Sequence, residues 1–218
     1  MQFTIREPGS SFTHFFGMLM TMLAAIPLLG TALATKDTSV ILSISVFITS
    51  MILLYGASTT YHGMNLTGKK LRIFRKIDHM MIFILIAGSY TPICVIALKE
   101  TIGYQALILI WSIALLGILI KAFWITCPKW FSSAIYIAMG WVCIFMIKEM
   151  YLQMPKISLL WLFIGGIIYT LGGVLYAFKL KMFNQLHPNF GSHEIFHLFI
   201  MGGSICHFVC MYYLIAKL

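Results

Sequence analysis

The chain has 218 residues, of which 61% are hydrophobic and only 10% are charged, and its formal net charge is +9. Soluble globular domains carry roughly 25% charged residues, so this chain has too few charges to cover a water-facing surface. The composition excludes an ordinary soluble protein and indicates an integral membrane protein. The length fits a single domain that spans residues 1–218.

The excess of basic residues does not indicate a nucleic-acid partner, because these residues lie between apolar stretches and form no continuous patch. Lysine and arginine accumulate in the cytoplasmic loops of membrane proteins, which explains the excess by topology. The expected partners are membrane lipids, including anionic headgroups, in the cell (plasma) membrane. No oligomeric state is predicted.

Seven stretches are long and apolar enough to cross a membrane, which takes about 20 residues as a helix. In chain order they are residues 12–34, 40–62, 78–98, 104–123, 132–152, 157–180 and 192–216. They are apolar on every face and lack the period of two that β-barrel strands show. The predicted fold is an all-α bundle of seven transmembrane helices, with longer connections at residues 63–77 and 181–191.

The first stretch is predicted to be a membrane helix and not a cleaved signal peptide. Its apolar run extends over residues 12–34, whereas the apolar region of a signal peptide has about 7–15 residues.

The basic residues predict a cytoplasmic N-terminus and a C-terminus outside, because cytoplasmic segments are the richer in lysine and arginine. With this orientation ten basic residues lie inside and five lie outside. Those inside are Arg6, Lys69, Lys70, Arg72, Arg75, Lys76, Lys121, Lys129, Lys179 and Lys181, and those outside are Lys36, Lys99, Lys148, Lys156 and Lys217.

Four ionisable residues are expected at the same membrane level on the cytoplasmic side. His62 ends the second stretch, Asp78 begins the third, and His193 and His197 lie in the first turns of the seventh. Ionisable groups are costly within a membrane and usually mark functional sites. Their convergence predicts a site formed by three helices.

The spacing of His193 and His197 predicts a zinc site. Two residues four apart lie about 40° apart on one helix face, one turn above the other. His62 is the best third ligand, and a water would complete a tetrahedral site of the catalytic kind. Asp78 is expected to ligate the metal directly, to hold its water or to orient a histidine ligand.

Ser58 is one turn from His62 and is expected to face the same cavity. It donates a hydrogen bond either to a substrate carbonyl or bound water, or to its own helix backbone. Asp78 and Ser58 are the predicted catalytic residues. His14 is expected to support the cavity, whereas His207, about 15 Å further along the helix than His197, is too distant to share the metal.

The segment from His193 to His197 also matches HExxH, the signature of zinc metalloproteases, in which the glutamate is the general base. Glu194 has a second interpretation, because a carboxylate in the first turn of a helix complements the helix dipole. A protease would leave Ser58, His62 and Asp78 without a role.

The residues from Ser58 to His62, Asp78-His79, residues 86–92 (IAGSYTP) and the pair His193 and His197 resemble the hemolysin III family, the bacterial branch of the progestin and adipoQ receptor group. Thr13-His14, residues 172–176 and residues 203–207 also resemble it, so the resemblance spans nearly the whole chain.

This resemblance implies seven helices, a cytoplasmic N-terminus and zinc held by His62, His193 and His197. It implies that Ser58 and Asp78 match the family's serine and aspartate. The wider superfamily includes alkaline ceramidases, which implies a zinc-dependent hydrolase of a lipid amide or ester with a role in membrane homeostasis. The alternatives are a non-catalytic membrane sensor or a cytolytic haemolysin with structural zinc, and thirdly an intramembrane HExxH metalloprotease.

Overall fold

The computed structural model describes residues 4–178, 191–216 and 218. Within these residues all regular structure is helical, and seven helical spans are long and apolar enough to cross a membrane. In chain order the elements are α1 (Pro8–Ala34), α2 (Thr38–Gly63), α3 (Gly68–Pro92), η1 (Ile93–Ala97), α4 (Gly103–Phe123), α5 (Lys129–Gly140), η2 (Trp141–Met146), α6 (Ile147–Gln153), α7 (Lys156–Phe178) and α8 (Ser192–Ile215).

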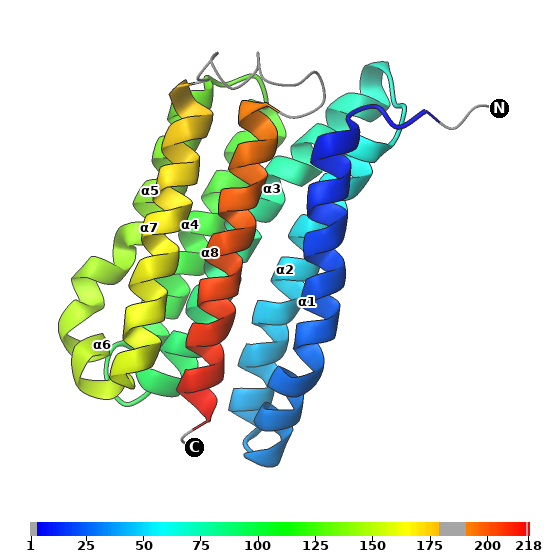
Figure 1. Cartoon of the computed structure of the whole chain (residues 1–218). Helices are drawn as coiled ribbons and strands as arrows, with labels where there is room; N and C mark the ends of the chain where they lie inside the picture. Colours follow the sequence, from blue (N-terminus) through cyan, green and yellow to red (C-terminus); the bar gives the residue numbers. More distant parts are fainter. Residues whose placement is uncertain (1–3, 179–190, 217) are drawn as a thin grey trace.

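The predicted seven-helix membrane fold is confirmed. The spans lie side by side in one bundle, and the first turn of α1 and the last turn of α8 are at opposite ends of it (Figure 1). The predicted ends of α1, α2, α4 and α8 agree with the structure to within four residues. The sixth prediction ends in residues 179–180, which lie outside the described residues, as does most of the predicted connection at 181–191.

The third predicted helix, residues 78–98, starts ten residues too late. Residues from Gly68 onward, which were predicted to be a loop, form the first turns of α3. The prediction followed the apolar run, but lysine and arginine are good helix formers and need no membrane around them. Lys69, Lys70 and Arg72 are exposed on this part of α3. The helix therefore continues beyond its apolar portion.

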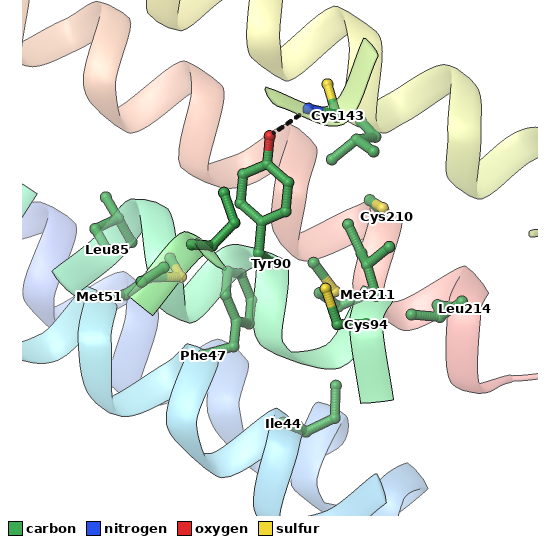
Figure 2. Packing of buried hydrophobic residues seen from close by; sticks show 14 of the residues in the cluster. Ile44, Phe47, Met51, Leu85, Tyr90, Cys94, Cys143, Cys210, Met211 and Leu214 are labelled. Carbon is green, nitrogen blue, oxygen red and sulfur yellow. Dashed lines mark hydrogen bonds between the residues drawn. The ribbon is translucent and has the colours of Figure 1, made fainter. Parts of the chain in front are cut away.

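The fifth predicted helix, residues 132–152, is not continuous. The α-helix α5 changes at Trp141 into the 3₁₀ segment η2 before α6 completes the span. The hydroxyl of Tyr90 on α3 accepts a hydrogen bond from the Cys143 N–H (2.8 Å, Figure 2) and donates one to the Gly140 carbonyl (2.7 Å). A side chain inserted into the helix hydrogen-bond ladder is a known cause of such interruptions.

The same region forms part of the apolar core. Phe47 and Met51 of α2 pack near Tyr90 and Leu85 of α3, and Met211 of α8 lies on the other side of Tyr90 (Figure 2). Four of these five side chains are at most 4% exposed, and Tyr90 is 6% exposed. This packing fixes α2, α3 and α8 against one another, and these three helices carry the predicted site residues.

Glycines allow α7 and α8 to approach closely. A Cβ added to Gly172 would lie 2.7 Å from Cβ of Phe199, and one added to Gly203 would lie 2.7 Å from the ring of Tyr169. Small residues at helix contacts are typical of membrane bundles, where close backbone packing contributes to helix association. These contacts hold α8 close against α7.

Candidate metal centre

Three histidines converge at the end of the bundle where α2 ends and α8 begins. His62 lies in the last turn of α2, and His193 and His197 lie in the first two turns of α8. One ligand nitrogen from each residue lies within 4.8 Å of the other two. The Nε2 atoms of His62 and His193 are 3.3 Å apart. The three predicted ligands are therefore close enough to bind one metal ion.

Hydrogen bonds at the opposite ring nitrogens orient two of these ligands. Nδ1 of His62 contacts the carboxylate of Glu7, and Nδ1 of His197 lies 3.1 Å from the hydroxyl of Thr13. With Nδ1–H as the donor in both, each Nε2 carries a lone pair. Histidine ligands of zinc typically have this arrangement, with an oxygen acceptor behind the ring. The residues fit a zinc ion of the three-histidine kind.

The turn that precedes α1 brings Glu7 to His62. The backbone N–H of Glu7 donates a hydrogen bond to the carbonyl of His62 (3.0 Å), and the N–H of Arg6 donates one to the carbonyl of Gly63 (3.4 Å). The hydrogen bond from His62 lowers the pKa of Glu7 below its ordinary value, with help from the charge of Arg6 and against partial burial. Glu7 is therefore a carboxylate at neutral pH.

Sequence reasoning missed Glu7 and Thr13, because neither lies near a histidine ligand along the chain. The signals were their place just before and within the first turns of a predicted helix that begins on the cytoplasmic side and, for Thr13, its part in the family resemblance. His14 was expected to support the cavity, and its buried ring stacks on that of His197, with centroids 3.5 Å apart and planes 9° apart. Neither ring nitrogen of His14 has a hydrogen-bond partner among the described residues.

A cavity of about 150 Å³ begins beside the histidines and extends into the bundle. Ser58 and Asp78, the two predicted catalytic residues, line it together with His14, His193 and His197. Most of the remaining wall is apolar or aromatic, with His207 among its residues. Two of the three close histidines and the two predicted catalytic side chains thus face one largely apolar cavity.

Asp78 lies outside the group of three close ligands. Its carboxylate is 3.3 Å from Nδ1 of His79, a ring that also contacts the carbonyl of Arg75. One of the roles expected for Asp78 was to orient a histidine ligand. Glu7 makes the orienting contact with His62, and Thr13 makes the one with His197. The geometry therefore favours a role for Asp78 at the cavity.

Glu194 does not line the cavity. Its carboxylate accepts hydrogen bonds from the hydroxyl of Ser10 and from the N–H of Gly191 (2.8 Å). It thus caps α8 and joins it to α1, which agrees with the second interpretation of this residue and disfavours the metalloprotease.

Comparison with known proteins agrees with this architecture. The family model described as haemolysin-III related matches residues 3–208. A hemolysin-3 homolog from Bacillus subtilis (strain 168) is 36% identical over 99% of this chain and 97% of its own length. Hemolysin-3 from Bacillus cereus is 34% identical over 96% of this chain and 92% of its own length.

A more distant relative is the adiponectin receptor protein of Drosophila melanogaster, 24% identical over 93% of this chain and 49% of the receptor. No solved structure matches significantly. The relatives and the seven spans identify a multipass protein of the plasma membrane, in contact with its lipids. The family model covers nearly all of the chain, and two relatives are more than 30% identical to it. The chain therefore belongs to the haemolysin-III-related family.

Proposed function

We propose that this protein is a zinc-dependent hydrolase of a lipid amide or ester. The observation that carries the proposal is the position of His62, His193 and His197 at one end of an apolar cavity whose wall includes Asp78 and Ser58. Three histidine ligands leave one coordination position for water or substrate, as in catalytic zinc sites.

His62, His193 and His197 would hold the ion through the nitrogens that face one another. Zinc bound in this way supplies a Lewis acid that makes a water nucleophilic near pH 7 and polarises a carbonyl group. Glu7 and Thr13 would keep the rings of His62 and His197 in the tautomer required for binding, by accepting hydrogen bonds from their Nδ1 atoms. The stacked ring of His14 limits rotation of His197.

Asp78 and Ser58 would act on the reacting groups. The Asp78 carboxylate would accept a proton from the attacking water and return it to the leaving group. The Ser58 hydroxyl would donate a hydrogen bond to the carbonyl oxygen as negative charge develops on it. The apolar part of the cavity would bind the hydrocarbon chain and keep bulk water away from the reaction.

Metal content is the first test. Elemental mass spectrometry of protein purified without chelator should find about one zinc per chain, the stoichiometry of a single three-histidine site. His193→Ala/His197→Ala should lose the zinc, whereas His207→Phe, at a histidine outside the cluster, should keep it. Well-folded wild-type protein that contains no zinc would refute the proposal.

Catalysis is tested separately with Asp78→Asn. This variant should retain zinc and lose turnover of amide- or ester-linked lipids, because it removes a proton acceptor but no ligand. Equal lipid turnover in wild type, Asp78→Asn and His197→Ala would eliminate the hydrolase.

One observation favours a second candidate function, a sensor or cytolytic protein with structural zinc. The three histidines join α2 to α8, and Glu7 and Thr13 attach both helices to α1. If zinc is present, if its removal lowers the melting temperature, and if no lipid is hydrolysed, this second function replaces the first.

A further inference from the structure

The first turns of α3 carry a column of basic side chains on one face. Lys69, Arg72 and Lys76 are spaced three and four residues apart, so they lie one above the other along the helix. Lys69 and Arg72 are exposed, and Lys76 is half-buried. No acidic side chain in the described parts of the chain forms an ion pair with any of them. The column is therefore open to an anionic partner from outside the chain.

This basic column lies beside the last turn of α4. The ammonium group of Lys76 donates a hydrogen bond to the carbonyl of Ala122, near the end of that helix. The next two residues, Phe123 and Trp124, are 86% and 50% exposed, and Leu119, one turn before Phe123, is exposed as well. A basic column and an exposed apolar strip thus meet at one corner of the bundle, which we call the α3–α4 corner.

The lengths of the two helices place this corner at the membrane surface. About 20 residues cross the hydrocarbon core as a helix, and residues 78–97 of the third span supply that number without the basic turns. The helix α4 has 21 residues, so its last turn reaches the same surface. The basic column is about 10 Å long by the rise per residue. It therefore lies in and just outside the headgroup layer, with the apolar strip at the edge of the hydrocarbon core.

We propose that the α3–α4 corner binds an anionic phospholipid. Lys69 and Arg72 pair with its headgroup, because a guanidinium and an ammonium group together suit a phosphate. One acyl chain lies along Phe123 and Leu119. A zwitterionic headgroup fits less well, because it brings a positive charge to a column of positive charges.

The apolar strip favours a lipid over a soluble anion or a nucleic acid, because neither of these has a hydrocarbon chain to cover it. None of the residues at the corner lines the cavity beside the histidines. The inference therefore goes beyond the proposed function and does not depend on it.

Lipid titration of the purified full-length protein in a neutral detergent tests this site. Dioleoylphosphatidylglycerol and dioleoylphosphatidylcholine have the same acyl chains and differ in headgroup charge. Native mass spectrometry of the lipid-bound protein gives a dissociation constant for each lipid. The anionic lipid should bind about tenfold more tightly, as expected for two basic residues that act on a single headgroup.

Lys69→Gln/Arg72→Gln should bind the two lipids with equal affinity. Both side chains are exposed, so the fold should be retained. Lys36→Gln/Lys99→Gln is the matched control, because it removes two exposed lysines at the other end of the bundle and should keep the preference. A detergent micelle has no two sides, so any effect of these residues on membrane orientation does not enter the measurement.

Four outcomes would overturn the proposal. The first is equal affinity for the two lipids in the wild type, and the second is a preference that survives in Lys69→Gln/Arg72→Gln. The third is an equal loss in the control variant, since net charge and not this corner would then determine binding. The fourth is displacement of the bound lipid by an equal concentration of sn-glycerol 3-phosphate or of a short DNA duplex, which would assign the corner to a soluble anion or to nucleic acid.

Discussion

At the scale of single residues, the candidate metal centre depends on side chains that would not themselves touch the metal. Glu7 and Thr13 each contact a histidine ligand on its far side, and His14 stacks against the ring of His197. All three lie in or just before the first turns of α1. The start of α1 thus orients candidate metal ligands that belong to α2 and α8.

Glu7→Gln should weaken zinc binding without abolishing it. The amide retains an acceptor oxygen but loses the charge that raises the basicity of His62, and such supporting changes reduce metal affinity about 10- to 100-fold. Competition with a chromophoric chelator measures the loss. Glu100→Gln, at a side chain that is 86% exposed, is the matched control and should bind zinc like the wild type. Equal affinity in both variants would show that Glu7 has no part in the site.

At the scale of elements, two of the seven spans are not regular apolar helices, each for a different reason. The first turns of α3 are polar and extend past the apolar part of the helix. The span of α5, η2 and α6 is interrupted where Tyr90 replaces part of the backbone hydrogen bonding. Irregular backbone at membrane depth is tolerated where other protein groups satisfy it.

Tyr90→Phe should destabilise the bundle. Removal of the hydroxyl takes a partner from the N–H of Cys143 and leaves the carbonyl of Gly140 with only a weak contact from the Cys143 thiol (3.6 Å), which costs about 1–3 kcal/mol. Denaturant unfolding in detergent measures this change. Tyr104→Phe alters an exposed tyrosine in the same chemical way and should have little effect. If the two variants are equally stable, the hydroxyl does not maintain the interruption.

The start of α2 predicts a dependence of stability on pH. Asp37 accepts a hydrogen bond from the N–H of Ser39 (2.8 Å), which lowers the pKa of its carboxyl group. Since the folded-state pKa lies below the unfolded value of about 3.9, this stabilisation is complete above the unfolded value. It is lost as the pH falls through the folded-state pKa.

At pH 7, Asp37→Ala should therefore lower the melting temperature, whereas Asp37→Asn, which also caps a helix, should change it little. Below about pH 3.9 the wild type should lose stability relative to Asp37→Asn. Thermal melts of the three proteins across this range check the expectation. Parallel pH profiles of wild type and Asp37→Asn would contradict it.

At the scale of the whole molecule, seven spans place the first turn of α1 and the last turn of α8 at opposite ends of the bundle (Figure 1). The candidate metal centre lies at the same end as the exposed basic turns of α3. Lys121, one of the basic residues expected inside, is buried and hydrogen-bonded to Ser132 and Cys127. The exposed lysines and arginine of α3 are the better determinants of orientation.

We expect these residues to hold the N-terminus in the cytoplasm and the C-terminus outside. Reporter fusions at each end, active only on one side of the membrane, measure this directly. Replacement of Lys69, Lys70 and Arg72 by glutamine should increase the fraction of inverted molecules, whereas replacement of Lys36 and Lys99 should not. An external N-terminus in the wild type would show that the charge count misidentified the sides.

The sequence by itself determined the membrane environment, the number of spans and most helix ends, because these depend on apolar length and local composition. The sequence also placed His62, Asp78, His193 and His197 at one membrane level, because the rise per residue and the alternating direction of successive spans determine the depth of each residue. Only the tertiary structure decided which side chains contact one another at that depth. The pairing of Glu7 with His62, the insertion of Tyr90 beside Cys143 and the space that Gly165 leaves for His207 join residues far apart in the chain. Such contacts depend on how helices rotate and pack against one another, which uniformly apolar helices do not encode in their periodicity.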